Sequence, residues 1–174
     1  MSDDDVIKDI KEILEKVFDN VNHWLDFAEA KNAALIVFNI ALITVLSAWN
    51  NMHLNVLRSV IMLGCILSTI VALWSFWPRC NIKKKFGVIT SNDNYLFYKD
   101  IAKYTYEEYL KIICEEYFNK DPGTLIVKHK LLIQYAEEII SLSKITLKKY
   151  QLFQIGVAID IISLIITALF IIMA

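Results

Sequence analysis

The residue whose chemistry most needs an explanation is Asp160, because residues 152–174 carry no other charge. A carboxylate in the hydrocarbon of a bilayer costs on the order of 2.5–3.5 kcal/mol, so it should face protein or water rather than lipid. At about 1.5 Å per helical residue, Asp160 lies roughly 12 Å into this run. Two roles are open: a pore-lining or gating group, or a hydrogen-bonded carboxyl that only fixes helix packing.

Polar residues at a matching depth occur in the two other long apolar runs of the chain. They are Asn39 in the first run, and Ser68 and Thr69 in the second. Together with Asp160 they predict a polar layer inside a helical bundle, formed within one subunit or around a symmetry axis.

A second group of chemically useful residues lies between the second and third apolar runs. The cations Arg79, Lys99 and Lys103 occur near Asn94 and the aromatic residues Phe97 and Tyr104. Cations, amides and aromatic rings suit the phosphate, base edge and base face of a nucleotide. The alternative is that these Lys and Tyr side chains only anchor the protein at lipid headgroups.

No pattern typical of catalysis or metal binding occurs in the sequence. It contains no P-loop, GxGxxG, HExxH or GxSxG motif. The three histidines lack ligand spacing, and the three cysteines form neither a CxxC pair nor an even-numbered framework. We therefore expect no enzymatic activity, no metal and no cofactor.

The elements that must position these residues are helices in a membrane. Of the 174 residues 56% are hydrophobic, which exceeds the share of about 45–50% in soluble domains. Only 21% are charged, and the mean hydropathy is +0.45. Residues 33–49, 59–77 and 152–174 form runs of the length that crosses a bilayer, the first at the short end of that range. The predicted fold class is an all-α membrane protein with three transmembrane helices.

The distribution of Lys and Arg predicts the orientation. The predicted external loop 50–58 contains one Arg, whereas 13 Lys and Arg lie in the long segment after the second run. The positive-inside rule therefore places residues 1–32 and 78–151 in the cytoplasm and the C-terminus outside.

The cytoplasmic segments are predicted to be helical. Residues 1–32 carry an apolar stripe that predicts one amphipathic helix running into the first span. Thr105 and Glu108 form a capping box that predicts a helix ending near Asn119. A turn is expected at residues 121–123, followed by a second helical stalk from Leu125 into the third span. Whether the stripes pack within one chain or between subunits is left open.

Four separated stretches resemble the Pycsar membrane effectors, of the pyrimidine cyclase system for antiphage resistance. They are FAEAKNAALIVFN (27–39), PRC (78–80), NYLFYKDIAKYTYEEYL (94–110) and ISLSKITLKKYQLF (140–153). The resemblance covers nearly the whole chain in order.

The resemblance implies an antiphage defence effector without catalysis in the bacterial inner membrane. A partner cyclase would make cyclic UMP or cyclic CMP, and the effector would bind it and impair the membrane, causing growth arrest or abortive infection. Membrane lipid and further copies of the chain are the other expected partners, and nucleic acid is not one.

Polar positions of the resembling stretches are expected near the cytoplasmic mouth of the spans. They comprise Glu29, Lys31, Asn32, Arg79, Asn94, Phe97, Asp100, Tyr104, Ser143, Lys144, Lys148 and Tyr150. The ligand-binding set expected from both arguments is Arg79, Asn94, Phe97, Lys99, Lys103, Tyr104 and Lys144. The alternative is a structural collar that joins the stalks to the spans.

Two other functions are compatible with the residues. One is a small constitutive oligomeric channel or transporter that uses Asp160. The other is a membrane scaffold whose stalks bind a partner helix.

Overall fold

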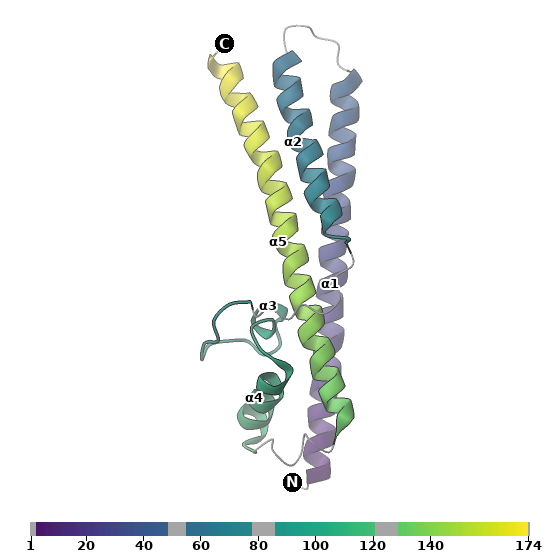
Figure 1. Cartoon of the computed structure of the whole chain (residues 1–174), viewed down its shortest axis with the longest axis vertical. Coiled ribbons are helices and arrows are strands. Elements are labelled where there is room, and N and C mark those ends of the chain that lie inside the picture. Colours follow the sequence, from purple (N-terminus) through teal and green to yellow (C-terminus); the bar gives the residue numbers. More distant parts are fainter. Residues whose placement is uncertain (1–2, 49–54, 78–85, 121–128, 174) are drawn as a thin grey trace. The chain divides into compact units, whose positions relative to one another are not determined.

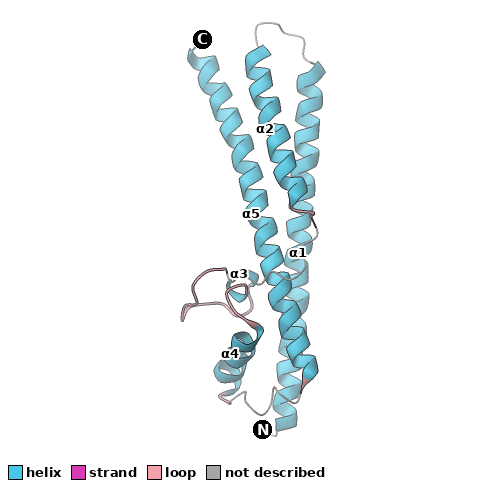
Figure 2. Ribbon diagram, in the orientation of Figure 1, coloured by secondary structure: helices cyan, strands magenta, loops and turns pink. Residues whose placement is uncertain are grey.

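The computed structural model of the chain describes residues 3–48, 55–77, 86–120 and 129–173. All regular elements among these residues are helices, and no strand occurs among them (Figures 1 and 2). They are α1 (Asp3–Ala48), α2 (Asn55–Trp74), α3 (Tyr98–Ile101), α4 (Tyr106–Phe118) and α5 (Lys130–Met173). The predicted all-α fold class is confirmed.

The helices and loops of the chain belong to two compact units. Residues 1–26 and 79–147 form the stalk unit, and residues 27–78 and 148–174 form the spanning unit. The chain passes from one unit to the other within α1 and again within α5. The 46 residues of α1 include neither Gly nor Pro, so the sequence gives this helix no intrinsic break.

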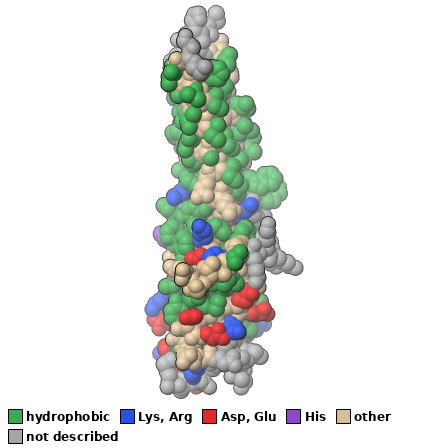
Figure 3. Space-filling view, turned by 90° about the vertical axis from the view of Figure 1, so that its left-hand side faces the viewer, with side chains coloured by type: hydrophobic (Ala, Val, Ile, Leu, Met, Phe, Trp, Pro, Cys, Tyr) green, Lys and Arg blue, Asp and Glu red, His purple; other side chains and the backbone are tan. Residues whose placement is uncertain are grey.

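The spanning unit turns apolar side chains outward. Its parts of α1, α2 and α5 are long and apolar enough to cross a membrane. Val37, Leu63 and Ile165 are each more than half exposed, while the buried residues of α2 are Gly64, Cys65, Ser68 and Ala72. Helices that pack in lipid have small and polar residues inside and large apolar residues outside, and this unit shows that pattern. Hydrophobic side chains accordingly cover this unit in Figure 3, and charged side chains gather on the stalk unit.

Two glycines allow the spanning helices to approach closely. A Cβ added at Gly64 would lie 2.0 Å from Ser163 Oγ, so α2 and α5 pack there with almost no space between them. A Cβ at Gly156 would lie 2.8 Å from Leu35 Cδ2 and 3.3 Å from Ser68 Oγ. α1, α2 and α5 therefore meet around Gly156.

The stalk unit has an ordinary apolar core. α1 contributes an apolar stripe at helical spacing, and α4 and α5 contribute aliphatic residues and Tyr109. The fully or nearly fully buried side chains are Val6, Ile10, Leu14, Val17, Val21, Tyr109, Leu110, Ile113, Leu132, Ala136 and Ile139. Because these residues come from distant parts of one chain, the stripes of both stalks pack within the subunit.

The predicted capping box opens α4. Thr105 N donates to Glu108 Oε2 at 2.8 Å, and Glu108 N donates to Thr105 Oγ1 at 3.3 Å. The helix ends at Phe118, and its C-cap residue Asn119 adopts the left-handed conformation at φ 50°. The predicted turn at residues 121–123 and the predicted start of the second stalk at Leu125 lie outside the described residues.

Candidate functional site

The spanning unit brings Asn39, Ser68 and Asp160 together. Asn39 Nδ2 donates to Ser68 Oγ at 2.9 Å, and Ser68 Oγ donates to Asp160 Oδ2 at 2.8 Å. The three side chains come from α1, α2 and α5, and all are buried. The serine hydroxyl thus links the amide to the carboxyl, and we call these three residues the inner polar layer.

Thr69 does not take part in these hydrogen bonds. Its Oγ1 is buried and has no hydrogen-bond partner among the described residues. Asn39 Oδ1 and Asp160 Oδ1 are also buried without such a partner. The inner polar layer therefore retains unused hydrogen-bonding capacity, which is expensive in a low-dielectric interior.

A second polar cluster in the spanning unit centres on Lys149. Lys149 Nζ lies 3.0 Å from Glu29 Oε1 and donates to the Ser75 backbone oxygen at 3.0 Å. Asn32 Nδ2 donates to the backbone oxygen of Lys149 at 3.2 Å. These four residues, here called the outer polar layer, tie α1, the end of α2 and α5 together. Such contacts are what a structural collar requires, which is the alternative role expected for Glu29 and Asn32.

Lys31 lies among aromatic rings in the same unit. Its Nζ is 4.6 Å from the ring centroid of Phe27, 5.3 Å from that of Tyr150 and 5.6 Å from that of Phe153. Each distance is within the range of a cation–π interaction. Through Tyr150 and Phe153, Lys31 therefore links α1 to α5.

Two of the predicted ligand-binding residues instead contact a buried carboxylate in the stalk unit. Lys103 Nζ lies 2.7 Å from Asp93 Oδ1 and 2.7 Å from Asp100 Oδ1. Tyr104 OH donates to Asp93 Oδ2 at 2.8 Å, and Thr90 also donates to the carboxylate. Lys103 and Tyr104 thus position the loop that contains Asn94, Phe97 and Lys99.

The pKa values of this cluster reflect its geometry. Burial alone would raise the pKa of Asp93, but hydrogen bonds from Lys103, Thr90 and Tyr104 hold it well below its usual range. Burial and the hydrogen bond to Asp93 raise the pKa of Tyr104. The hydrogen bonds to Asp100 and Asp93 raise the pKa of Lys103. Each residue is thereby held in its ordinary charge state at neutral pH.

The remaining predicted ligand residues differ in their accessibility. Asn94 and Lys99 are exposed, whereas Lys144 is buried. The Phe97 ring packs edge-on against Trp24 at 6.1 Å between centroids. Arg79 lies outside the described residues.

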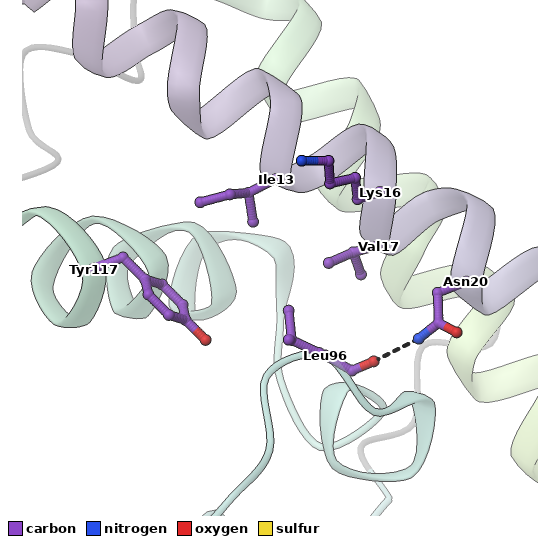
Figure 4. Close-up of a pocket in the computed structure, with 6 residues that line it drawn as sticks. All are labelled: Ile13, Lys16, Val17, Asn20, Leu96 and Tyr117. Carbon is purple, nitrogen blue, oxygen red and sulfur yellow. Dashed lines mark hydrogen bonds between the residues drawn. The ribbon is translucent and has the colours of Figure 1, made fainter.

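A cavity in the stalk unit lies beside this loop. It is a half-open hollow of about 270 Å³, lined by Ile13, Lys16, Val17, Asn20, Leu96 and Tyr117 (Figure 4). Asn20 Nδ2 donates to the Leu96 backbone oxygen at 3.0 Å, which fixes the loop to α1. Lys16 Nζ lies 2.8 Å from Glu12 Oε1, and the Tyr117 side chain is 48% exposed. The cavity thus combines an apolar floor with an amine, an amide and a phenol.

The sequence pattern does not single out Lys16, Asn20 or Tyr117. They lie on the flank of the α1 stripe and on α4, outside the segment 94–104. The apolar periodicity of the sequence includes Ile13 as a core residue. In the structure it is only half-buried, and its neighbour Leu14 is fully buried instead. That shift leaves Ile13 free to line the cavity.

The described residues contain no group of three or more His, Cys, Asp or Glu side chains that could hold a metal ion.

Comparison with known proteins gives one informative match. A family model described as the Pycsar effector protein domain matches residues 13–174. No curated protein and no solved structure matches the chain.

Proposed function

The chain belongs to the Pycsar effector protein domain family and is an antiphage defence effector, and we propose that it binds a cyclic pyrimidine nucleotide and then impairs the membrane. The observation that carries the proposal is the family match across both units of the chain, together with three helices able to span a bilayer. The family implies a partner cyclase and a cyclic nucleotide signal. Cyclic UMP and cyclic CMP are the two ligands proposed.

The proposed ligand site is the cavity beside Leu96, because it adjoins the loop that the sequence selects. Its volume of about 270 Å³ is close to the lower end, about 300 Å³, of small-molecule pockets. Tyr117 offers a ring face for a pyrimidine base, and stacking on an aromatic side chain is worth about 1–3 kcal/mol per base. Lys16 offers a charge for the cyclic phosphate, which would replace Glu12 as its partner.

The exposed residues Asn94 and Lys99 extend this proposed site beyond the cavity. Phe97, Lys103 and Tyr104 then act as positioning residues, since each is engaged by other side chains of the stalk unit. Arg79 and Lys144 are still proposed to provide positive charge for the phosphate of the ligand. This division of roles keeps the seven residues expected from the sequence and adds Lys16, Asn20 and Tyr117.

The proposed location is the bacterial inner membrane, with the stalk unit in the cytoplasm and the C-terminus outside. The 13 Lys and Arg between the second and third spans support this orientation. A homo-oligomer in contact with lipid is the proposed assembly.

A ligand can switch the protein only by binding one arrangement better than another. The cavity is lined by residues of α1, and α1 continues without Gly or Pro into the first span. We propose that ligand binding changes the position of this helix and thereby the packing of the spans.

Calorimetry on the purified full-length chain in detergent tests the ligand site. We expect one pyrimidine cyclic nucleotide to bind, and Tyr117→Ala and Lys16→Gln each to weaken binding by about tenfold or more. Lys11→Gln is the matched control, because Lys11 pairs with Glu15 on the same helix but does not line the cavity. Binding that is unaffected by both cavity variants, or weakened equally by the control, would contradict this site.

A constitutive channel remains a second candidate because of the buried carboxyl in the inner polar layer. Such a channel would conduct ions without any nucleotide, whereas the proposed effector conducts only when its ligand is bound.

A further inference from the structure

Buried polar residues occur at two levels of the spanning unit. On α1, Asn32, Leu35 and Asn39 follow one another at steps of three and four residues, and all three are buried. On α2 and just beyond it, Ser68 and Ser75 are seven residues apart and both are buried. Residues spaced in this way share one face of a helix. Asn32 of the outer layer and Asn39 of the inner layer therefore share the inward face of α1.

Both layers contain polar atoms that lack protein partners. Asn32 Oδ1 and Ser75 Oγ in the outer layer are buried without a hydrogen-bond partner among the described residues. The same is true of Asn39 Oδ1 and Asp160 Oδ1 in the inner layer. Buried water ordinarily satisfies such groups, making about three hydrogen bonds per molecule. Two hydrated layers are the simplest way to satisfy these four atoms.

Leu35 is the buried apolar side chain between the two layers on α1. Its Cδ2 packs over Gly156 of α5, where a Cβ would lie only 2.8 Å away. A Cβ at Gly156 would also lie 3.3 Å from Ser68 Oγ of the inner layer. The leucine thus sits against a helix backbone directly beside the hydrogen-bonded serine.

From this arrangement we propose that the spanning unit of a single chain holds a proton-binding site at Asp160, and that Leu35 closes it off from the outer polar layer. Asp160 is the only carboxyl group among the described residues of the three predicted spans. Its Oδ2 accepts from Ser68, so Oδ1 is the atom left to exchange a proton with water. Movement of Leu35 away from Gly156 would join the two layers and let protons pass along water and the carboxyl.

The proposed permeant is the proton rather than a hydrated metal ion. The contact of Gly64 with Ser163 leaves no room between α2 and α5, and Gly156 is similarly covered by Leu35 and Ser68. A hydrogen-bonded chain of water and a carboxyl needs less width than a hydrated cation. The inference deepens the proposed membrane impairment and rests on it for its biological meaning, but it can be tested without any nucleotide.

The test is proton flux into liposomes that contain the purified full-length chain and a trapped pH-sensitive dye. A potassium gradient with valinomycin sets the potential. We expect Leu35→Ala to raise the nucleotide-free proton flux at least about tenfold over wild type, equivalent to lowering the barrier by about 1.4 kcal/mol. Adding Asp160→Asn should return the flux to the wild-type level. The matched control is Leu63→Ala, the same substitution at a side chain that is 58% exposed on α2, and it should not change the flux.

Trapped carboxyfluorescein separates a proton pathway from general leakage, because the dye is too large for the proposed route. The inference would be overturned if Leu35→Ala left the proton flux unchanged or if Leu63→Ala raised it equally. It would also be overturned if Asp160→Asn had no effect on the flux or if dye release accompanied it. If Leu35→Ala does not reconstitute with wild-type helicity, Leu35→Val provides the smaller cavity in a folded protein and is judged by the same criteria. If the chain bound no cyclic nucleotide, the proposed function would be contradicted, but the proton-flux result would still hold because the test uses no nucleotide.

Discussion

Lys103 Nζ lies 2.7 Å from Asp93 Oδ1, and this ion pair joins two ends of the loop that is proposed to take part in ligand binding. The side chains are 15% and 2% exposed, so the pair is largely shielded from water. Removing one partner of a buried pair costs about 3–5 kcal/mol. Here Asp100 also contacts Lys103, so the expected loss is at the lower end of that range or below it.

Asp93→Ala is therefore expected to lower the free energy of unfolding of the stalk unit by about 2–3 kcal/mol at pH 7. Chemical denaturation in detergent, followed by tyrosine and tryptophan fluorescence, measures this loss. Lys111→Ala is the control, since its pair with Glu115 is exposed and should contribute about 0–1 kcal/mol. An equal loss in both variants would contradict the role given to Asp93.

The Asp93 carboxylate also predicts a pH dependence. Because its pKa in the folded protein is lowered, the pair stabilises the fold at pH values above about 4, the ordinary pKa of an unfolded Asp. This contribution is lost as the pH falls from there toward the lowered pKa. The stability difference between wild type and Asp93→Ala should be constant from about pH 5 to 7 and shrink at about pH 3, as denaturation at each pH will show. A difference that grows at the acidic end would refute the assignment.

Gly64→Ala should separate α2 from α5. The added Cβ would fall 2.0 Å from Ser163 Oγ and 2.7 Å from Ser163 Cβ, so the helices must move apart. Overpacking of this kind costs about 1–3 kcal/mol. Thermal denaturation in detergent should show a lower midpoint for Gly64→Ala and its recovery in the double variant with Ser163→Gly. Absence of recovery would mean that Ser163 is not the limiting contact.

Lys31 provides a test of the aromatic contacts near the outer polar layer. Lys31→Gln should lower the stability of the spanning unit by about 1–2 kcal/mol, because it removes the charge over the rings of Phe27, Tyr150 and Phe153. Lys31→Arg keeps a cation and should retain most of the stability. Similar thermal midpoints for the two variants would show that charge is not what matters at this position.

Flexible insertions test whether the stalk and spanning units communicate through α1. A three-glycine insertion after Asn32 should abolish nucleotide-dependent membrane leakage while leaving nucleotide affinity within about twofold of wild type, because Gly weakens the helix. The same insertion between Val88 and Ile89, both exposed and outside the helices, serves as the control. Leakage that still follows nucleotide in the first variant would exclude coupling through the helix.

Much of the fold could be predicted from the sequence because its signals are local. The capping box at Thr105 and Glu108 and the apolar stripe of α1 depend on spacing within one helix, and the structure contains both. The depth of Asn39, Ser68 and Asp160 could be counted from the ends of the apolar runs. The hydrogen bonds among them depend on the rotation of each helix, which depth alone does not determine.

The proposed ligand site is harder to predict from the sequence because it depends on long-range packing. Lys103 and Tyr104 have the chemistry of nucleotide contacts, but the sequence does not reveal that Asp93 engages both. Nor does it reveal that Leu96 meets Asn20, 76 residues away, beside a cavity that includes Tyr117. Helix α3 has only four residues, which is too short for a hydrophobic period from which a helix could be predicted.

The most direct test of the central claim is the membrane potential of cells that express this chain with a cyclase of known product. We predict depolarisation with one pyrimidine cyclic nucleotide, none with a purine product and none without a cyclase. The Asp160→Asn variant should be expressed in the membrane but fail to depolarise it. Depolarisation in every condition would contradict the ligand-dependent effector and favour a constitutive channel, and a membrane-localised protein that never depolarises would contradict both.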